Sequence, residues 1–241
     1  MRPALIEVGG LARFSTVDWP GMMTATVFCQ GCGWRCRYCH NPHLIPFRHQ
    51  SLDTVLSDGN EEDGWTWTSV AAWLRDRRGL LNGVVFSGGE PTLQPRLAEA
   101  MAQARELGFR VGLHTGGPVP EALSEVLPLA DWVGFDFKAP FACYARVTGR
   151  DAGAKAAESL RLLRASGVDF EVRTTWHPIL LRETDLAAMA DTLAEAGVSE
   201  WVVQRFRRDG CADVELCASA MGGGVVPEAE LARAGLTVRV R

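Results

Sequence analysis

The sequence predicts an α/β protein built on a parallel sheet, and three observations lead to that prediction. Short apolar runs alternate with amphipathic stretches of about ten to fifteen residues. Six expected strands follow one another with a helix between each pair, mostly in units of about 25 to 40 residues, as expected for a strand with its crossover helix. The 241 residues are 47% hydrophobic and 22% charged, which suits one domain with a sizeable core.

The six expected strands are apolar runs that end in glycine, a charged residue or a hydroxyl. In chain order they are Met23–Cys29, Gly83–Ser87, Phe109–Thr115, Asp131–Lys138, Val168–Thr175 and Trp201–Phe206. The amphipathic stretches between them predict helices at about Thr68–Arg78, Pro95–Leu107, Pro120–Leu127, Ala152–Gly167 and Thr184–Gly197. One face of the second helix carries apolar residues at helical spacing, namely Leu97, Met101, Ala104 and Leu107.

Parallel strands joined by right-handed crossovers form either an open doubly wound sheet or an incomplete barrel. Both arrangements place functional groups at the carboxyl ends of the strands. We expect one domain over residues 1–241, with its repeating core at about residues 23–206. Outside this core, Leu236–Val240 alternates apolar and polar residues and is expected to form an extra edge strand. The polar, acidic segment Ser51–Gly64 is expected to be an exposed loop.

The charge pattern argues against two broad classes of protein. Lys and Arg total 25 against 29 Asp and Glu, and a net charge of -4 disfavours binding to nucleic acid through bulk charge. The longest uncharged run, Trp19–Trp34, is no membrane span because Pro and Gly residues interrupt it. Met1–Gly10 has no apolar signal core, so we expect the seven cysteines to bind metal or stay reduced in the cytoplasm.

The densest chemical signal follows the first expected strand, where four of the seven cysteines lie within eleven residues. A zinc site would use all four as thiolate ligands, namely Cys29, Cys32, Cys36 and Cys39. An iron–sulfur cluster with one open iron would use only the last three, which are spaced C-x3-C-x2-C. Such tight grouping favours a metal site over unliganded buried thiols, and both metals remain open at this point.

The three-cysteine spacing, with the aromatic Tyr38 before the last cysteine, resembles the radical S-adenosylmethionine (SAM) superfamily. Phe14–Gly21 and Cys39–Pro42, on either side of the cysteines, are similar to segments of glycyl-radical-enzyme activases. Ser87–Pro91 (SGGEP) is similar to the glycine-rich SAM motif of the superfamily. Within that group the chain resembles the longer form of the anaerobic ribonucleoside-triphosphate reductase activating protein, with pyruvate formate-lyase activating enzyme as a near relative.

The resemblance implies an incomplete (β/α)6 barrel of the TIM type, with a [4Fe-4S] cluster held by Cys32, Cys36 and Cys39. The iron without a protein ligand would bind the amino and carboxylate groups of SAM. One electron from the reduced cluster would break the S–C5′ bond, and the 5′-deoxyadenosyl radical would take a hydrogen atom from the substrate. No catalytic residue is expected beyond the cluster and SAM, because the cofactors supply the difficult chemistry.

The resemblance also implies the partners. The substrate would be a backbone glycine of a glycyl radical enzyme, foremost anaerobic ribonucleoside-triphosphate reductase, reached through a lateral opening of the barrel. Reduced flavodoxin or ferredoxin would donate the electron. The alternatives are activation of pyruvate formate-lyase or another glycyl radical enzyme, and a radical SAM reaction on a small molecule, as in deazapurine biosynthesis. A zinc or iron–sulfur module without catalysis is the alternative from a different class.

Several residues beside the cysteines or near expected strand ends are candidates for SAM contacts. Tyr38 adjoins the last cysteine. Gly88 and Gly89 permit close backbone approach, and the carboxylate of Glu90 suits the SAM ammonium group. The alternative for these three is a glycine turn with a surface glutamate. His114 stands where related activases often carry an acidic residue, so a core histidine is an equal alternative.

Further candidates end the later strands. Asp136 and Lys138 are sent to the same side of the fourth strand by alternation, with Phe137 opposite. Lys138 would meet the SAM carboxylate and Asp136 a ribose hydroxyl or a cation, unless the two form a solvated ion pair. Arg173 is a second candidate for the carboxylate, or else forms a salt bridge at the barrel rim. Gln204 could reach the ribose or adenine, although a structural role is favoured.

The remaining cysteines and two tryptophans have simpler interpretations. Cys143, Cys211 and Cys217 are scattered, so we expect thiols rather than ligands of a second cluster, and the role of Cys29 stays open. The tryptophans that border the acidic loop, Trp65 and Trp67, are expected in the core rather than in a lid or a partner contact.

Overall fold

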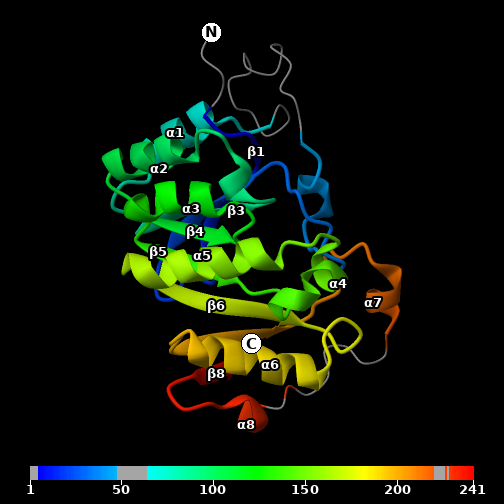
Figure 1. The fold of residues 1–241 in the computed structure, drawn as a ribbon. Helices are drawn as coiled ribbons and strands as arrows, with labels where there is room; N and C mark the ends of the chain where they lie inside the picture. Colours follow the sequence, from blue (N-terminus) through cyan, green and yellow to red (C-terminus); the bar gives the residue numbers. More distant parts are fainter. Residues whose placement is uncertain (1–4, 48–63, 220–225, 227) are drawn as a thin grey trace. The chain divides into compact units, whose positions relative to one another are not determined.

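The computed structural model describes residues 5–47, 64–219, 226 and 228–241 (Figure 1). The loop expected at Ser51–Gly64 therefore lies outside the described residues, apart from Gly64. Within the described part, no helix is both long enough and apolar enough to cross a membrane.

The strands of the described residues form one eight-stranded sheet whose order follows the sequence. β1 pairs with β2 antiparallel, whereas the pairs β2–β3, β3–β4, β6–β7 and β7–β8 are parallel. The strands are β1 (Val8–Ser15), β2 (Thr24–Cys29), β3 (Gly83–Gly88), β4 (Arg110–Thr115), β5 (Trp132–Asp136), β6 (Asp169–Trp176), β7 (Glu200–Arg205) and β8 (Thr237–Val240). This open, mostly parallel α/β sheet confirms the predicted fold class.

Helices connect the parallel strands in the expected alternation (Figure 1). The α-helices are α1 (Trp67–Arg75), α2 (Leu97–Glu106), α3 (Pro120–Val126), α4 (Tyr144–Thr148), α5 (Gly153–Ser166), α6 (Glu183–Glu195), α7 (Val214–Ala218) and α8 (Glu228–Leu231). The 3-10 turns are η1 (Pro42–Leu44), η3 (Pro91–Leu93), η4 (Leu127–Leu129) and η5 (Phe141–Cys143). Helices α1, α2, α3, α5 and α6 match the five expected helices, with ends that shift by a few residues.

The expected strands match β2 to β7, and β8 confirms the extra edge strand expected at Leu236–Val240. The fourth expected strand, Asp131–Lys138, ends earlier, at Asp136. The backbone nevertheless continues in contact with β6, because the amide of Phe137 donates to the carbonyl of Arg173 at 2.8 Å.

β1 is the strand that the pattern of apolar residues did not predict. Its sequence, VGGLARFS, is mostly half-buried or exposed, and its register against β2 shifts twice, between Val8 and Gly10 and between Ala12 and Ser15. A strand with two such irregularities has no sustained period of two in its side chains. Val8–Ser15 therefore gave no strand signal in the sequence, although it forms a strand.

The chain divides into two compact units, which are described separately. Unit 1 comprises the described residues of Met1–Gly33, His43–Thr115 and Glu121–Gly134. The interiors of β2, β3 and β4 are almost entirely buried, as expected for parallel strands covered on both faces. Trp19 stacks on Trp132 with ring centroids 5.6 Å apart, which closes the core beside β3.

Unit 2 comprises the described residues of Trp34–Pro42, Gly116–Pro120 and Phe135–Arg241. The middle of β6 and of β7 is buried, and the indole of Trp201, which is fully buried, donates to the Thr174 hydroxyl at 2.9 Å. A buried Trp N–H needs such a partner, so this contact fixes the packing of the two strands.

Candidate functional site

The first part of the cysteine loop belongs to unit 1 and is held by backbone hydrogen bonds. Gly31 N donates to Leu44 O at 2.8 Å, and Cys32 N donates to Ile45 O at 3.0 Å. The side-chain amide of Gln30 donates to two carbonyls of the same neighbouring segment, at 3.1 and 2.7 Å. The loop that leaves β2 is therefore fixed by the segment around η1 as far as Cys32.

The end of β3 lies against the end of β2, and this contact requires Gly88 and Gly89. Gly88 pairs with Cys29 in the parallel register and has a φ of +107°. A Cβ there would lie 2.5 Å from Cys29 N, and a Cβ at Gly89 would overlap the carbonyl of Gly31. Gly89 N also donates to Cys29 O at 2.8 Å, so the glycines allow two backbones to touch beside the cysteine loop.

Glu90 is 3% exposed, which rules out the surface glutamate considered from the sequence. Its amide donates to Gly31 O at 2.9 Å. Its Oε1 accepts from Thr92 N at 3.1 Å and from the hydroxyls of Thr92 and Thr115, each at 2.7 Å. The carboxylate thus caps η3 and ties β3 to β4, and contact with the SAM ammonium group stays a prediction.

Cys29 differs from the cysteines that follow it. It is fully buried at the end of β2, and burial, with a smaller contribution from the Glu90 carboxylate, raises the pKa of its thiol far above the ordinary value. Metals are bound by thiolates, and a thiol that resists deprotonation makes a poor ligand. This property favours the three-cysteine set over the four-cysteine zinc site.

His114 holds the N-terminal segment of unit 1. Its Nε2 donates to the carbonyl of Asp18 at 2.7 Å, and its Nδ1 lies 3.1 Å from the Ser87 hydroxyl. The ring also meets Trp132 edge-on, with centroids 5.7 Å apart. These contacts support the structural interpretation of His114, and a role in binding SAM stays a prediction.

The second part of the cysteine loop, Trp34–Pro42, belongs to unit 2. Cys39 N donates to Cys36 O at 3.0 Å, which makes a turn between these two cysteines. Tyr38 is 6% exposed, and its ring centre lies 5.6 Å from Lys138 Nζ. The ring of Trp34 lies 5.7 Å from the same ammonium group. The candidate cofactor contact Tyr38 therefore lies beside the candidate Lys138, as a cation–π pair.

Asp136, Lys138 and Arg173 form one charged group in unit 2. Lys138 Nζ lies 3.3 Å from Asp136 Oδ2, and Arg173 approaches Asp136 Oδ1 at 2.9 Å, so alternation correctly placed Asp136 and Lys138 on one side. Burial, the largest single influence, lowers the pKa of Lys138, but the Asp136 carboxylate and the neighbouring Tyr38, Cys36 and Tyr144 together outweigh it, so the pKa of Lys138 is raised well above its usual value. The Asp136 carboxylate thus lies between two cations, Lys138 and Arg173.

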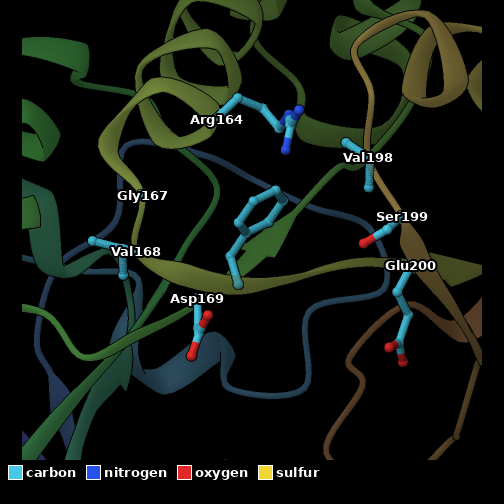
Figure 2. A pocket seen from close by; sticks show the side chains of 8 residues that line it. Arg164, Gly167, Val168, Asp169, Val198, Ser199 and Glu200 are labelled. Carbon is cyan, nitrogen blue, oxygen red and sulfur yellow. The ribbon is translucent and has the colours of Figure 1, made fainter.

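Gln204 lies in β7 opposite Thr175 of β6 and is half-buried. The cavity of about 270 Å³ in unit 2 lies elsewhere, between Gly167–Phe170 and Val198–Glu200 at the amino ends of β6 and β7. Figure 2 shows Arg164 over this cavity, with Asp169 and Glu200 at its sides. Because it lies at the opposite ends of the strands from Gln204, this cavity is not part of the candidate site.

The network around Arg37 was missed by sequence reasoning. Arg37 lies between Cys36 and Cys39, and its guanidinium pairs with Asp213 and Glu215 at 2.7 Å each. The hydrogen bond from Arg37 is the main reason why the pKa of Asp213 is lowered. Asp213 is also the N-cap of α7, and an Asp before a short apolar run is a signal that could have revealed it.

Cys32, Cys36 and Cys39 are half-buried, and none of the seven cysteines, which all lie in the described part, forms a disulfide. Cysteine thiolates are the donors that iron–sulfur clusters use, so the chemistry of these three side chains fits the group. The described residues contain no set of three His, Cys, Asp or Glu side chains gathered closely enough to hold a metal ion. Cluster ligation by these three cysteines therefore stays a prediction.

The remaining sequence expectations concern single residues. Trp67 is buried in α1, where its indole donates to Gln103 Oε1 at 2.7 Å, so the core interpretation is confirmed for it. Trp65 is half-buried under the guanidinium of Arg13. Cys211 and Cys217 lie in the segment that carries α7.

The sequence matches a known protein family. Residues 26–196 match the Radical SAM superfamily, and this stretch includes most of β2, all of β3 to β6 and the whole cysteine loop. The chain belongs to the radical SAM superfamily, whose members use a [4Fe-4S] cluster and SAM.

Within the superfamily, the chain is similar to several individual proteins. A provisionally named glycyl-radical enzyme activating enzyme of Methanocaldococcus jannaschii is 31% identical, over 86% of this chain and 83% of its own length. Pyruvate formate-lyase-activating enzyme of Clostridium pasteurianum is 37% identical over 55% of this chain and 52% of its own length. A 7-carboxy-7-deazaguanine synthase of Methanopyrus kandleri is 34% identical over 50% of this chain and 51% of its own length. The chain thus spans about half the length of the last two.

Solved structures are similar in fold. A radical SAM methyltransferase from Sphaerobacter thermophilus has a TM-score of 0.62 at 15% identity, over 99% of this chain and 77% of that one. At this identity the likeness concerns the fold alone, and it agrees with the open, mostly parallel sheet described above.

Proposed function

We propose that this chain is a glycyl-radical-enzyme activase and that it acts as a single radical SAM domain on anaerobic ribonucleoside-triphosphate reductase. The observation that carries the proposal is the likeness, along 86% of the chain, to a protein provisionally named as a glycyl-radical enzyme activating enzyme, together with the three-cysteine loop. The segments Phe14–Gly21 and Cys39–Pro42, which resemble activases, support the same class of substrate.

In this proposal Cys32, Cys36 and Cys39 hold a [4Fe-4S] cluster. When bound, the cluster and SAM supply reductive cleavage of the sulfonium and, through it, abstraction of a hydrogen atom from a glycine of the partner. Reduced flavodoxin or ferredoxin is the proposed electron donor, and the reducing cytoplasm the proposed compartment.

The chain's own residues bind and orient. Lys138 and Arg173 both lie against Asp136, and in this proposal the two cations bind the carboxylate of SAM. Gly88 and Gly89 keep the backbone of β3 against the start of the cysteine loop, and the amide of Glu90 holds that approach through its hydrogen bond to Gly31 O. Tyr38 shields Lys138 from water, which strengthens its pairing with an anion.

The test is anaerobic reconstitution of the chain with iron, sulfide, SAM and a reductant, followed by mixing with candidate partner enzymes. We expect a glycyl radical, detected by electron paramagnetic resonance, on anaerobic ribonucleoside-triphosphate reductase and a much weaker signal on pyruvate formate-lyase. The preparation should hold about four irons and four sulfides per chain and no zinc. A Cys36→Ser variant is the control that should give neither cluster nor radical.

A second candidate function is a radical SAM reaction on a small molecule, and the likeness to 7-carboxy-7-deazaguanine synthase over half the chain supports it. Formation of 5′-deoxyadenosine without a protein radical on any candidate partner would favour this alternative. One zinc ion per chain in place of iron would instead favour the module without catalysis.

A further inference from the structure

The segment that carries Cys36 and Cys39, Trp34–Pro42, is irregular until η1 begins at its end. Its shape therefore depends on contacts with other parts of unit 2. On one side, Arg35 N donates to Thr148 O at 2.8 Å and Arg37 N donates to Val147 O at 3.3 Å. The end of α4 thus holds the backbone just before and just after Cys36.

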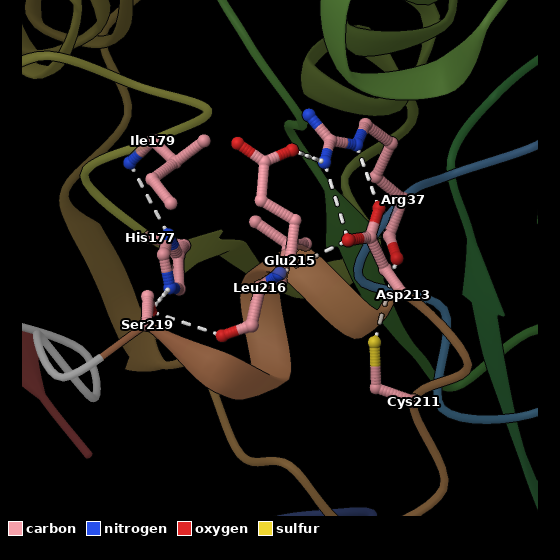
Figure 3. A network of polar contacts seen from close by, with 8 residues as sticks. All are labelled: Arg37, His177, Ile179, Cys211, Asp213, Glu215, Leu216 and Ser219. Carbon is pink, nitrogen blue, oxygen red and sulfur yellow. Dashed lines mark hydrogen bonds and ion pairs between the residues drawn. The ribbon is translucent and has the colours of Figure 1, made fainter.

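A second set of contacts comes from the segment that leads into α7, and Figure 3 shows them around Arg37. Arg37 Nε donates to Asp213 Oδ2 at 2.7 Å and Nη2 donates to Oδ1 at 3.2 Å, a two-bond pair. Nη2 also donates to Glu215 at 2.7 Å. The thiol of Cys211 donates to the carbonyl of Arg37 at 3.4 Å. Side chain and backbone of Arg37 are both held by this one segment.

The same segment holds the residue after Cys39. His40 Nε2 lies 2.9 Å from the carbonyl of Arg207, and the His40 ring stacks on Phe206 with centroids 5.9 Å apart. Gly210, at a φ of +81°, lies so close that a Cβ there would overlap the carbonyl of His40. The cysteine pair is therefore held at Arg37 and at His40 by residues 206–215.

Helix α7 is itself anchored, so it can act as a fixed support. The fully buried His177 lies with Nε2 2.9 Å from the Ser219 hydroxyl, which donates to Leu216 O at 3.0 Å (Figure 3). Ile179 N donates to His177 Nδ1 at 3.2 Å. Leu216 is 1% exposed, which secures the helix in the core of unit 2.

We propose that Asp213 is a positioning residue for the cluster, acting through Arg37 on the segment between Cys36 and Cys39. The inference rests on the proposed cluster site. Asp213 is the stronger of the two carboxylates, because it takes two bonds from Arg37 and its side chain is 18% exposed, against 67% for Glu215. Paired Arg–carboxylate bonds fix orientation as well as distance, whereas exposed ion pairs contribute little.

The test uses the full chain with Asp213→Asn. Asparagine caps a helix as well as aspartate does, so Leu216 N keeps an acceptor at the start of α7. Its amide nitrogen, however, replaces the Oδ2 that accepts from Arg37 Nε and places two donors against each other. The variant therefore breaks the 2.7 Å bond from Arg37 Nε, so that only the longer bond from Nη2 to Oδ1 remains, and it keeps the cap of α7.

Two quantities are measured after anaerobic reconstitution. The first is the rate at which an iron(II) chelator removes iron, which we expect to rise about tenfold in Asp213→Asn and to stay within about twofold of wild type in Glu215→Gln. The second is the electron paramagnetic resonance spectrum of the reduced cluster, before and after SAM is added. We expect the change caused by SAM to differ from wild type in Asp213→Asn alone.

Asp131→Asn is the matched control, since Asp131 also pairs with an arginine, Arg105, and accepts from a backbone amide, Val111 N. It should leave both quantities unchanged. Because Asp213 acts through Arg37, the double variant with Arg37→Lys should be no worse than the worse single variant. Asp213→Glu, which restores the charge, should recover part of the effect.

Failure of the positioning role and failure of the proposed function give different results. Wild-type iron release and a wild-type spectrum in Asp213→Asn would overturn the positioning role while leaving the proposed function in place. Additive effects with Arg37→Lys would also overturn it, because Asp213 would then act by another route. A wild-type protein that assembles no cluster would overturn both the inference and the function on which it rests.

Discussion

At the scale of single residues, burial separates Cys29 from the three cysteines that follow it. Cys29 ends a buried strand and its thiol resists ionisation, whereas Cys32, Cys36 and Cys39 are half-buried on an irregular loop. Spacing in the sequence leaves four possible ligands. Because Cys29 is buried inside the sheet, only the other three cysteines have the accessibility that a metal ligand needs.

The first prediction concerns this difference. Cys29→Ala should keep the full iron and sulfide content, at a cost of about 1–2 kcal/mol in the free energy of unfolding from the lost packing. Cys32→Ser should bind little iron. Chemical analysis of iron, sulfide and zinc after reconstitution measures the difference. Equal loss of metal in both variants would point to a site with four thiolates.

Gly89 has two possible roles, one in the SAM motif and one in the packing of the backbone. The sequence pattern assigned it to the SAM motif. The structure shows that Gly89 is also needed for close packing, because any side chain there would overlap the carbonyl of Gly31 at the start of the cysteine loop. The glycine is therefore required by the fold whether or not SAM is bound.

At the scale of elements, α7 is tied into unit 2 by a histidine whose proton position is fixed. His177 Nδ1 accepts from Ile179 N, so the proton lies on Nε2, toward Ser219. Burial, and then the nearby Arg37, lower the pKa of His177 below its usual value of 6.5. Protonation of Nδ1 would break the bond with Ile179 and place a charge in the core.

This arrangement predicts the sign of a pH effect. The unfolded chain takes up a proton at His177 before the folded chain does. The stabilisation is complete above pH 6.5 and is lost as the pH falls below it, by up to about 1.4 kcal/mol per pH unit. Urea unfolding at several pH values between 7.5 and 5.5 measures the slope. His177→Gln should flatten it by that amount, and an unchanged slope would mean that His177 titrates normally.

Small elements account for most of what the pattern of residues did not predict. Helices α4 and α7 have five residues each, too few for a period of 3.6 to be recognised. The irregular register of β1 hides its alternation in the same way. The long, regular elements β2 to β7 were predicted because each buries a continuous apolar run.

At the scale of the whole molecule, the proposed cluster would bind the folded chain and not the unfolded one, so it should stabilise the fold. We expect the reconstituted protein to unfold at least about 5 °C above the apoprotein. Anaerobic thermal unfolding followed by circular dichroism measures this shift. Cys36→Ser should unfold at the same temperature with and without reconstitution. A shift of equal size in that variant would show that iron binds elsewhere.

The sequence by itself determined the class of fold and the family, and it predicted the cysteine loop as a metal site, because these depend on local periodicity and on residue spacing along the chain. Only the tertiary structure decided which residues are buried and which distant residues are in contact. It buried Cys29 and Glu90, brought Gly88 and Gly89 onto the start of the loop, and paired Arg37 with Asp213, 176 residues further along. Contacts between residues so far apart depend on how strands and helices pack, and no local pattern in a single sequence records that packing.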